Sequence, residues 1–190
     1  MKNIAVFASG SGTNAEKIFE RFDQHPHARV RLLLTNNPKA RVIIRAARYD
    51  ISVLVFDRSI FLHTDEVLEA LQEARIDLIV LAGFMLKVPD NILKAYPDRV
   101  INIHPALLPN YGGKGMYGIH VHEAVVKARE KTSGISIHLC NENYDEGKII
   151  LQVSCALSPE DTAEDVAAKV QKLEHQYYPE VVEEVAMQLK

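Results

Sequence analysis

The sequence predicts an α/β fold in which helices cover both faces of a mostly parallel sheet. An antiparallel strand pair and a long helix are expected near the C-terminal end. Three observations support this prediction: short apolar runs that lack polar alternation, helical patterns between those runs, and two late strand-like runs joined only by NENYDEG. Strands covered on both faces read as continuous apolar segments, and parallel neighbours need long crossovers.

The parallel strands are expected in apolar runs rich in β-branched residues. These runs are IAVFA (4–8), VRLLLT (30–35), SVLVF (52–56), DLIVLAG (77–83) and VINIH (100–104). The stretches between them carry apolar residues at helical spacing. Alternation of strand and helix in this way predicts a Rossmann-like three-layer arrangement.

Two further runs, SGISIHLC (133–140) and KIILQVSC (148–155), are too close in sequence for a helical crossover. They are therefore expected to pair as antiparallel strands. We find no internal repeat, low-complexity tract or linker, so residues 1–190 are expected to form a single domain.

The last stretch begins with two capping boxes, Ser158 with Asp161 and Thr162 with Asp165. Apolar residues follow at helical spacing, namely Val166, Val170, Leu173 and Tyr177. A long helix is expected here, interrupted near Pro179.

Composition narrows the classes of function. The chain has 190 residues, 47% of them hydrophobic, and a formal charge of -3, so it can bury one core and has no overall basic field. Small-molecule substrates are favoured, with no nucleic-acid partner. The first apolar run, Ile4 to Ala8, is too short for a signal or a membrane span, so a cytoplasmic location without membrane binding is expected. Cys140 and Cys155 are interpreted as buried small hydrophobes without a function.

A glycine-rich turn follows the first strand. Gly10, Ser11, Gly12, Thr13 and Asn14 lead into a helix whose free N–H groups can bind a phosphate. The alternative is an ordinary tight turn with a helix N-cap at Thr13 or Asn14. Gly12→Val is expected to block phosphate binding with little loss of folded protein, unless Gly12 has a positive φ.

Other interpretations of this turn fit less well. The spacing of Gly10, Gly12 and Ala15 matches a dinucleotide fingerprint, but the second strand ends in Thr35-Asn36-Asn37 without the acid that would bind a ribose. Arg41 leaves a weak case for NADP. A receiver-like phosphoacceptor at Asp57 lacks the acidic pair after the first strand and has His104 where a lysine is expected.

Asn102 and His104 lie at the carboxyl end of the fifth run, where ligands bind in open parallel sheets. Residues two apart in a strand project to the same face, and the apolar pattern gives no reason for polar groups there. An amide beside an imidazole suits a carbonyl that becomes an oxyanion. Asp145, in the NENYDEG turn, could orient the imidazole, although Asn141, Glu142 and Asp145 could equally be ordinary turn residues.

Several motifs together carry a family resemblance: SGSGTN near the start, LAGFM (81–85), NIHPALLP, SIHLCNENYDEG and LEHQYYPEVV. Over nearly the whole chain they resemble the 10-formyltetrahydrofolate-dependent formyltransferases. Within that family, methionyl-tRNA formyltransferases are similar in one domain only. The glycine turn and the length resemble the branch that formylates glycinamide ribonucleotide in purine synthesis.

The resemblance implies a role for each group of residues. It implies that Asn102, His104 and Asp145 are catalytic. It implies that the turn from Gly10 to Asn14 holds the substrate phosphate, with Gln171 and Glu174, on one helical face, reaching the phosphate and ribose. The pterin of the formyl donor would contact the side chains of Met85, Leu86, Val88, Leu93, Asn141 and Glu142.

The expected reaction is direct formyl transfer through a tetrahedral intermediate, without a metal. His120 and His122 lie two apart, but no Cys or acid at ligand spacing joins them, so His120 is interpreted as a substrate-loop contact and His122 as structural. Small-molecule partners and a monomer or weak homodimer are expected. A formyltetrahydrofolate hydrolase and a non-catalytic nucleotide-binding module remain alternatives.

Overall fold

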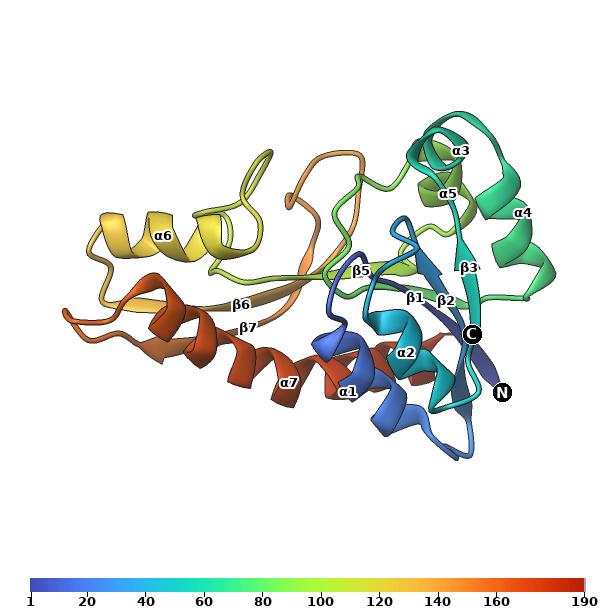
Figure 1. Cartoon of the computed structure of the whole chain (residues 1–190), viewed down its shortest axis with the longest axis horizontal. Coiled ribbons are helices and arrows are strands. Elements are labelled where there is room, and N and C mark those ends of the chain that lie inside the picture. Colours follow the sequence, from blue (N-terminus) through green and yellow to red (C-terminus); the bar gives the residue numbers. More distant parts are fainter. Residues whose placement is uncertain (190) are drawn as a thin grey trace. The chain divides into compact units, whose positions relative to one another are not determined.

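The structure, a computed structural model, describes residues 1–189. Its strands form one seven-stranded sheet in the order β3-β2-β1-β4-β5-β6-β7 (Figure 1). The strands are β1 (Lys2–Phe7), β2 (Ala28–Thr35), β3 (Ser52–Val55), β4 (Leu78–Leu81), β5 (Val100–His104), β6 (Thr132–Leu139) and β7 (Ile149–Ala156). All seven predicted strands are present, with ends that differ by a few residues.

The helices occupy the stretches with helical spacing. They are α1 (Thr13–Phe22), α2 (Val42–Ala47), α3 (Arg58–His63), α4 (Glu66–Glu73), α5 (Asp90–Ala95), α6 (Ile119–Lys127) and α7 (Ala163–Gln188). Strand β1 pairs in parallel with β2 and β4, and β2 with β3, whereas β6 and β7 are antiparallel. The predicted fold class, including the antiparallel pair and the long C-terminal helix, is confirmed.

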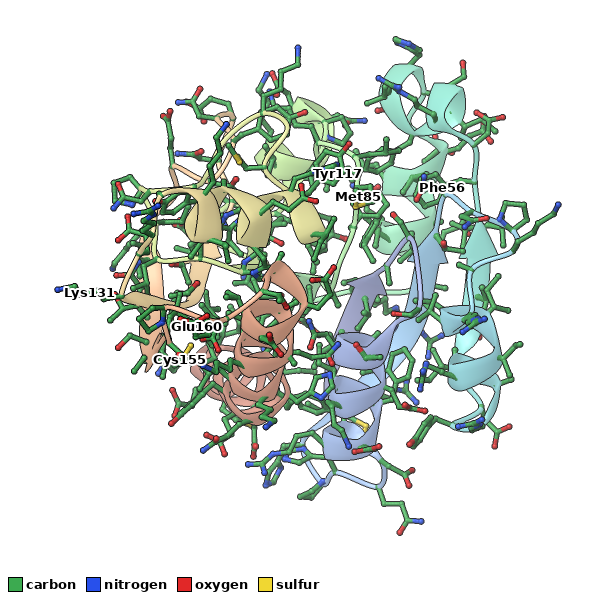
Figure 2. All side chains as sticks on the ribbon, turned by 60° about the vertical axis from the view of Figure 1, so that its left-hand side comes forward. Phe56, Met85, Tyr117, Lys131, Cys155 and Glu160 are labelled. Atoms are coloured by element: carbon green, nitrogen blue, oxygen red, sulfur yellow. The ribbon has the colours of Figure 1, made fainter. Side chains whose placement is uncertain are left out.

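The chain divides into two compact units, one formed by Met1–Ile101 with the segment from Val182 on, the other by Asn102–Val181. In the first unit, β1 and β4 are almost entirely buried. Four aromatic rings pack at the ends of these strands: Phe7, Phe56, Phe61 and Phe84, with ring centroids 5.0 to 6.2 Å apart. Figure 2 labels Phe56 in this group. The single domain over residues 1–190 stays a prediction.

The order of the strands reverses at β1, because the chain moves outward through β2 and β3 and returns to β4 on the other side. Loops after β1 and β4 therefore leave the same edge of the sheet. The Ser9 N–H donates to the Gly83 carbonyl at 3.1 Å, which joins these two loops. The switch point of the first unit thus holds the glycine turn.

In the second unit, β6 is buried along nearly all its length and β7 alternates between half-buried and exposed residues. Gly134 allows close approach of these strands, since a Cβ there would lie 2.1 Å from the Val153 carbonyl oxygen. The capping box before α7 forms between Thr162 and Asp165: the Asp165 carboxylate accepts from the Thr162 N–H at 3.0 Å, and Thr162 Oγ1 accepts from the Asp165 N–H at 3.2 Å. The expected box of Ser158 with Asp161 forms only in part, because the Asp161 carboxylate accepts from the Ser158 N–H at 2.8 Å while the Asp161 N–H donates to the Ser158 carbonyl.

The expected interruption of this helix near Pro179 is wrong, because α7 continues from Ala163 to Gln188 with the proline inside it. A proline costs a helix about 3 kcal/mol through one lost hydrogen bond and a steric clash. Pro179, however, is buried next to the fully buried Tyr178. We attribute the continuous helix to this burial, which offsets the local cost.

Candidate active site

Strand β5 carries the predicted pair into the second unit. Asn102 is half-buried, and His104, at the end of the strand, is buried. The ring of His104 is fixed on one side, because its Nε2 donates to the Tyr111 carbonyl at 2.8 Å. The other ring nitrogen, Nδ1, lies 3.6 Å from Oδ2 of Asp145.

Asp145 is held by the turn between β6 and β7. Its backbone is left-handed, with φ 56, and the Gly113 N–H donates to its Oδ2 at 2.9 Å. The turn closes tightly, since a Cβ on Gly147 would lie 1.7 Å from the Leu139 carbonyl oxygen. Besides glycine, Asp is one of the few residues that adopt a left-handed backbone conformation. The strained backbone thus places a carboxylate beside His104.

A residue that the sequence analysis missed completes the group. His138 is 2% exposed on β6, at a point where the register with β7 shifts between Ile137 and His138. Bulges of this kind redirect a side chain and are frequent beside active sites. One sequence signal was present: Ser136 and His138 are polar residues two apart in an apolar strand, the same pattern as Asn102 and His104.

His138 joins Asn102 to Asp145. Its Nδ1 donates to the Leu139 carbonyl at 2.9 Å, so in the neutral ring Nε2 is the acceptor. The Asn102 amide lies 3.2 Å from this Nε2, and Oδ1 of Asp145 lies 3.5 Å from it. Asn102, His138, Asp145 and His104 therefore form one continuous chain of polar contacts, which we call the polar chain.

Burial and charge act in opposite directions on this group. Burial lowers the pKa of His104, while the carboxylate of Asp145 and the bond to Tyr111 partly restore it. Burial would raise the pKa of Asp145, but the contact with His138, the hydrogen bond from the Gly113 N–H and the nearby His104 ring bring it below its usual value. Asp145 is thus an anion at neutral pH, facing two imidazoles.

The loop after β5 is fastened from β6 and β7. Ser136 Oγ donates to the Ala106 carbonyl at 2.7 Å and accepts from the Leu108 N–H at 2.9 Å. Gln152 Nε2 donates to the Leu108 carbonyl at 2.8 Å. These bonds hold the segment that follows His104 and so limit the directions its ring can take.

In the first unit, the glycine turn starts α1 without a side-chain cap. The N-cap is Gly12, with φ 73 and ψ 30, so the N-cap at Thr13 or Asn14 that the alternative interpretation of the turn assumed is wrong. A Cβ on Gly12 would lie 2.3 Å from Val42 Cγ2. The structure therefore requires glycine here both for conformation and for space.

Ser9 ties the turn to its neighbours. Its Oγ donates to Asn36 Oδ1 at 2.7 Å and accepts from the Met85 N–H at 3.0 Å. Asn37 Nδ2 donates to the Ser9 carbonyl at 3.3 Å. The asparagines after β2, which argued against a dinucleotide, thus brace the turn together with the loop after β4.

The remaining predicted residues are divided between the two units. In the first, Met85 is 50% exposed (Figure 2), Leu86 and Leu93 are half-buried, and Val88 is buried. In the second, Asn141 is half-buried and Glu142 exposed on the turn that carries Asp145. Gln171 and Glu174 lie three apart on α7, exposed and half-buried respectively.

The other titratable side chains differ in burial. His120 is exposed and faces Glu123 at 3.1 Å, whereas His122 is buried, and burial together with nearby His104 lowers its pKa. Cys140 and Cys155 are free, as expected, but they are half-buried rather than buried (Figure 2 labels Cys155). Burial raises the pKa of the Cys140 thiol to about 12.

Among residues 1–189 no group of three or more His, Cys, Asp or Glu side chains is placed to hold a metal ion.

The sheet with its glycine turn and the polar chain place this molecule in a known class. The model of the family described as "Formyl transferase" matches residues 2–182, so the chain belongs to this family. Within the family, several relatives at moderate identity are named phosphoribosylglycinamide formyltransferase. The chloroplastic enzyme of Arabidopsis thaliana is 41% identical over 187 residues, which cover 95% of this chain. The enzyme of Bacillus subtilis is 35% identical over 190 residues, covering 97% of this chain and 95% of the relative.

Solved structures give the same result. The phosphoribosylglycinamide formyltransferase of Anaplasma phagocytophilum has a TM-score of 0.90 at 32% identity, covering 98% of this chain and 87% of that one. Glycinamide ribonucleotide transformylase 1 of Geobacillus kaustophilus has a TM-score of 0.88 at 34% identity over 100% of both chains. The chain spans 64% and 60% of the lengths of the Arabidopsis thaliana and Vigna unguiculata relatives. No helix within the described residues is long and apolar enough to cross a membrane.

Proposed function

We propose that this chain transfers the formyl group of 10-formyltetrahydrofolate to the amine of glycinamide ribonucleotide, N1-(5-phospho-D-ribosyl)glycinamide, in de novo purine biosynthesis. The observation that carries the proposal is the polar chain, in which an amide, two imidazoles and a carboxylate are in contact within the second unit. Membership of the formyl transferase family and the name of the Bacillus subtilis relative, of which this chain covers 95%, support it.

Asn102, His104 and Asp145 are the proposed catalytic residues. An amide nitrogen has two N–H donors, so the Asn102 amide can keep His138 and still donate to the oxyanion that forms on the formyl carbon. The Nε2–H of His104 would have to exchange the Tyr111 carbonyl for the same oxyanion. Asp145 favours the charged form of His104 and accepts or relays the proton that the attacking amine loses.

His138 is a positioning residue in this proposal. It fills the space between the Asn102 amide and the Asp145 carboxylate, and the Leu139 carbonyl fixes its tautomer. Loss of the His138 ring would leave the Asn102 amide and the Asp145 carboxylate without their shared partner. We therefore expect these two groups to become misaligned, which lowers the turnover but leaves substrate binding intact.

The substrate-binding roles follow the family. Gly10, Ser11, Gly12, Thr13 and Asn14 would hold the nucleotide phosphate, and Gln171 and Glu174 its phosphate and ribose sides. The folate would be held by Met85, Leu86, Val88, Leu93, Asn141 and Glu142. Exposure of Met85 beside the glycine turn supports a ligand there, while the burial of Val88 gives it a packing role behind such a ligand. The reaction as proposed uses no metal.

The experiment follows deformylation of 10-formyltetrahydrofolate with and without glycinamide ribonucleotide. Turnover that requires the nucleotide and yields formylglycinamide ribonucleotide supports the transferase. Nucleotide-independent release of formate would instead indicate a formyltetrahydrofolate hydrolase, which the relatives do not favour. Nucleotide binding without any turnover would indicate a non-catalytic nucleotide-binding module.

The cellular setting is part of the proposal. We infer a cytoplasmic enzyme, monomeric or weakly dimeric, that has small-molecule partners and neither nucleic-acid nor membrane partners. The formal charge of -3 and the absence of a membrane-spanning helix within residues 1–189 are consistent with it. Sedimentation velocity across a range of protein concentrations tests the oligomeric state.

A further inference from the structure

Helix α2 holds two consecutive carbonyl groups of the glycine turn. The Val42 N–H donates to the Gly10 carbonyl at 3.2 Å, and Arg45 Nε donates to the Ser11 carbonyl at 2.8 Å. The close fit of Val42 against Gly12 completes this contact. Helices α1 and α2 lie side by side in the first unit (Figure 1), and the turn before α1 packs against Val42, the first residue of α2.

These bonds set the direction of the N–H groups as well. In a planar trans peptide the C=O and the following N–H point in opposite directions. Fixing the Gly10 carbonyl on Val42 therefore directs the Ser11 N–H away from α2, and fixing the Ser11 carbonyl on Arg45 does the same for the Gly12 N–H. Within residues 1–189 neither N–H has a protein acceptor. Both are available to an anion.

Arg45 also offsets a charge that works against an anion. Glu16 is in the first turn of α1, where its carboxylate suits the helix dipole but would repel a phosphate. Arg45 Nη1 forms an ion pair with Oε2 of Glu16, and Arg48 Nη1 lies 3.2 Å from Oε1. Two guanidinium groups on one carboxylate leave a net positive charge beside the turn.

Only one of the two arginines bonds the glycine turn, so a comparison of the two separates an effect on the position of the turn from an effect of charge. Arg45 is 25% exposed and contacts both the turn and Glu16, whereas Arg48 is 65% exposed and contacts Glu16 without bonding the turn. Both carry the same charge on the same helix end. Arg48 is therefore a matched control for Arg45.

We propose that Arg45 is a positioning residue for the nucleotide phosphate, which fixes the Ser11–Gly12 peptide so that its N–H points at the phosphate. The inference rests on the proposed function, because it needs the glycine turn to be the phosphate site. Arg45 acts through the backbone and neutralises Glu16, and it does not itself bind the ligand.

The test compares Arg45→Met, Arg45→Lys and Arg48→Met in steady-state kinetics and in calorimetric binding of glycinamide ribonucleotide. Arg45→Met should raise the KM and Kd for the nucleotide about tenfold, the effect expected for loss of one charge-assisted hydrogen bond. The kcat and the KM for 10-formyltetrahydrofolate should stay within about twofold, because Arg45 contacts Ser11 and Glu16 and not the residues assigned to the donor. Arg45→Lys should recover part of the loss, and Arg48→Met should change the nucleotide KM less than about twofold.

Different outcomes contradict different claims. Equal losses in Arg45→Met and Arg48→Met would mean that charge alone matters and would overturn the positioning role. Wild-type nucleotide binding in Arg45→Met would overturn it too. If Arg45→Met melts well below the wild type, Arg45→Lys decides, and an unchanged nucleotide KM there contradicts the required geometry. A wild-type protein that turns over formylfolate but does not bind the nucleotide contradicts the proposed function instead.

Discussion

His104 is subject to two opposing influences on its acidity. Burial lowers its pKa, and the carboxylate of Asp145, 3.6 Å from Nδ1, raises it. The neutral ring, with its proton on Nε2, presents a lone pair to that carboxylate, whereas the charged ring presents an N–H. The charged form is therefore the one that Asp145 stabilises, and it is also the better donor to a developing oxyanion.

Removing the carboxylate should move the acidity of His104 in a defined direction. In Asp145→Asn the favourable charge is lost while burial remains, so the pKa of His104 falls further. The limb of the pH–kcat profile that reports protonated His104 should then move to lower pH. Profiles of the wild type and Asp145→Asn, measured with both substrates saturating, check this. A limb at the same pH in both proteins would remove the assigned role of Asp145.

At the scale of single elements, the outcome of a substitution in the glycine turn depends on a local backbone angle. The sequence predicts that Gly12→Val spares the fold unless Gly12 has a positive φ, and Gly12 has φ 73 and no room for a Cβ beside Val42. Gly10, in contrast, has no atom within 4 Å of an added Cβ. The two glycines of this turn thus separate a structural requirement from a ligand requirement.

Alanine at the two positions should give different results. Gly12→Ala should lower the free energy of unfolding by at least about 1 to 2 kcal/mol, the cost of a left-handed L-residue, with the steric contact in addition. Gly10→Ala should melt like the wild type yet raise the nucleotide KM, because its methyl group enters the space that a phosphate would use. Thermal melts and nucleotide kinetics of both variants are the measurement. An unchanged nucleotide KM in Gly10→Ala would mean that the glycine turn does not bind the phosphate and has a structural role alone.

At the scale of the whole molecule, the elements that repeat a simple pattern were the predictable ones. Residues 4–7 of β1 and 78–81 of β4 are apolar and buried on both faces, so their pattern specifies strand, burial and parallel pairing together. The capping box of Thr162 with Asp165 predicted the start of α7, because its hydrogen bonds lie within one turn of chain. The antiparallel pair followed from a connection too short for any crossover.

Features that depend on tertiary contacts were harder to predict from the sequence. The continuous helix through Pro179 depends on burial that no local rule contains. His138 enters the polar chain through a shift in strand register, and the clamp of Arg45 on Ser11 joins positions 34 apart in the sequence. The pairing of Asn102 with His104 was visible because strand geometry alone puts them on one face. The family resemblance, rather than spacing, supplied the roles of Gln171, Glu174 and the folate residues.

Buried histidines should make the whole fold sensitive to acid. Burial lowers the pKa of both His104 and His122, and Nδ1 of His122 has no hydrogen-bond partner within the described residues. Below the unfolded pKa of about 6.5, the unfolded chain binds protons that the folded chain does not. The free energy of unfolding should therefore decrease as the pH falls from about 7 to 5.

Urea unfolding at pH 7, 6 and 5 measures this effect, and His122→Leu is the informative variant. It removes one of the two imidazoles whose pKa burial lowers and replaces no residue of the polar chain, so its stability should depend less on pH than that of the wild type over this range. A pH dependence equal to that of the wild type would mean that His122 does not titrate with folding.

The central claim is that the polar chain acts as one unit in formyl transfer, and a double-mutant cycle tests it most directly. Turnover is measured with saturating 10-formyltetrahydrofolate and glycinamide ribonucleotide for the wild type, His104→Ala, Asp145→Asn and the double variant, with calorimetry to show that each still binds the nucleotide. Each single variant should lose on the order of a hundredfold or more in kcat. The double variant should lose much less than the product of the two, because either change already breaks the unit. Multiplicative losses in variants that bind normally would contradict a coupled pair.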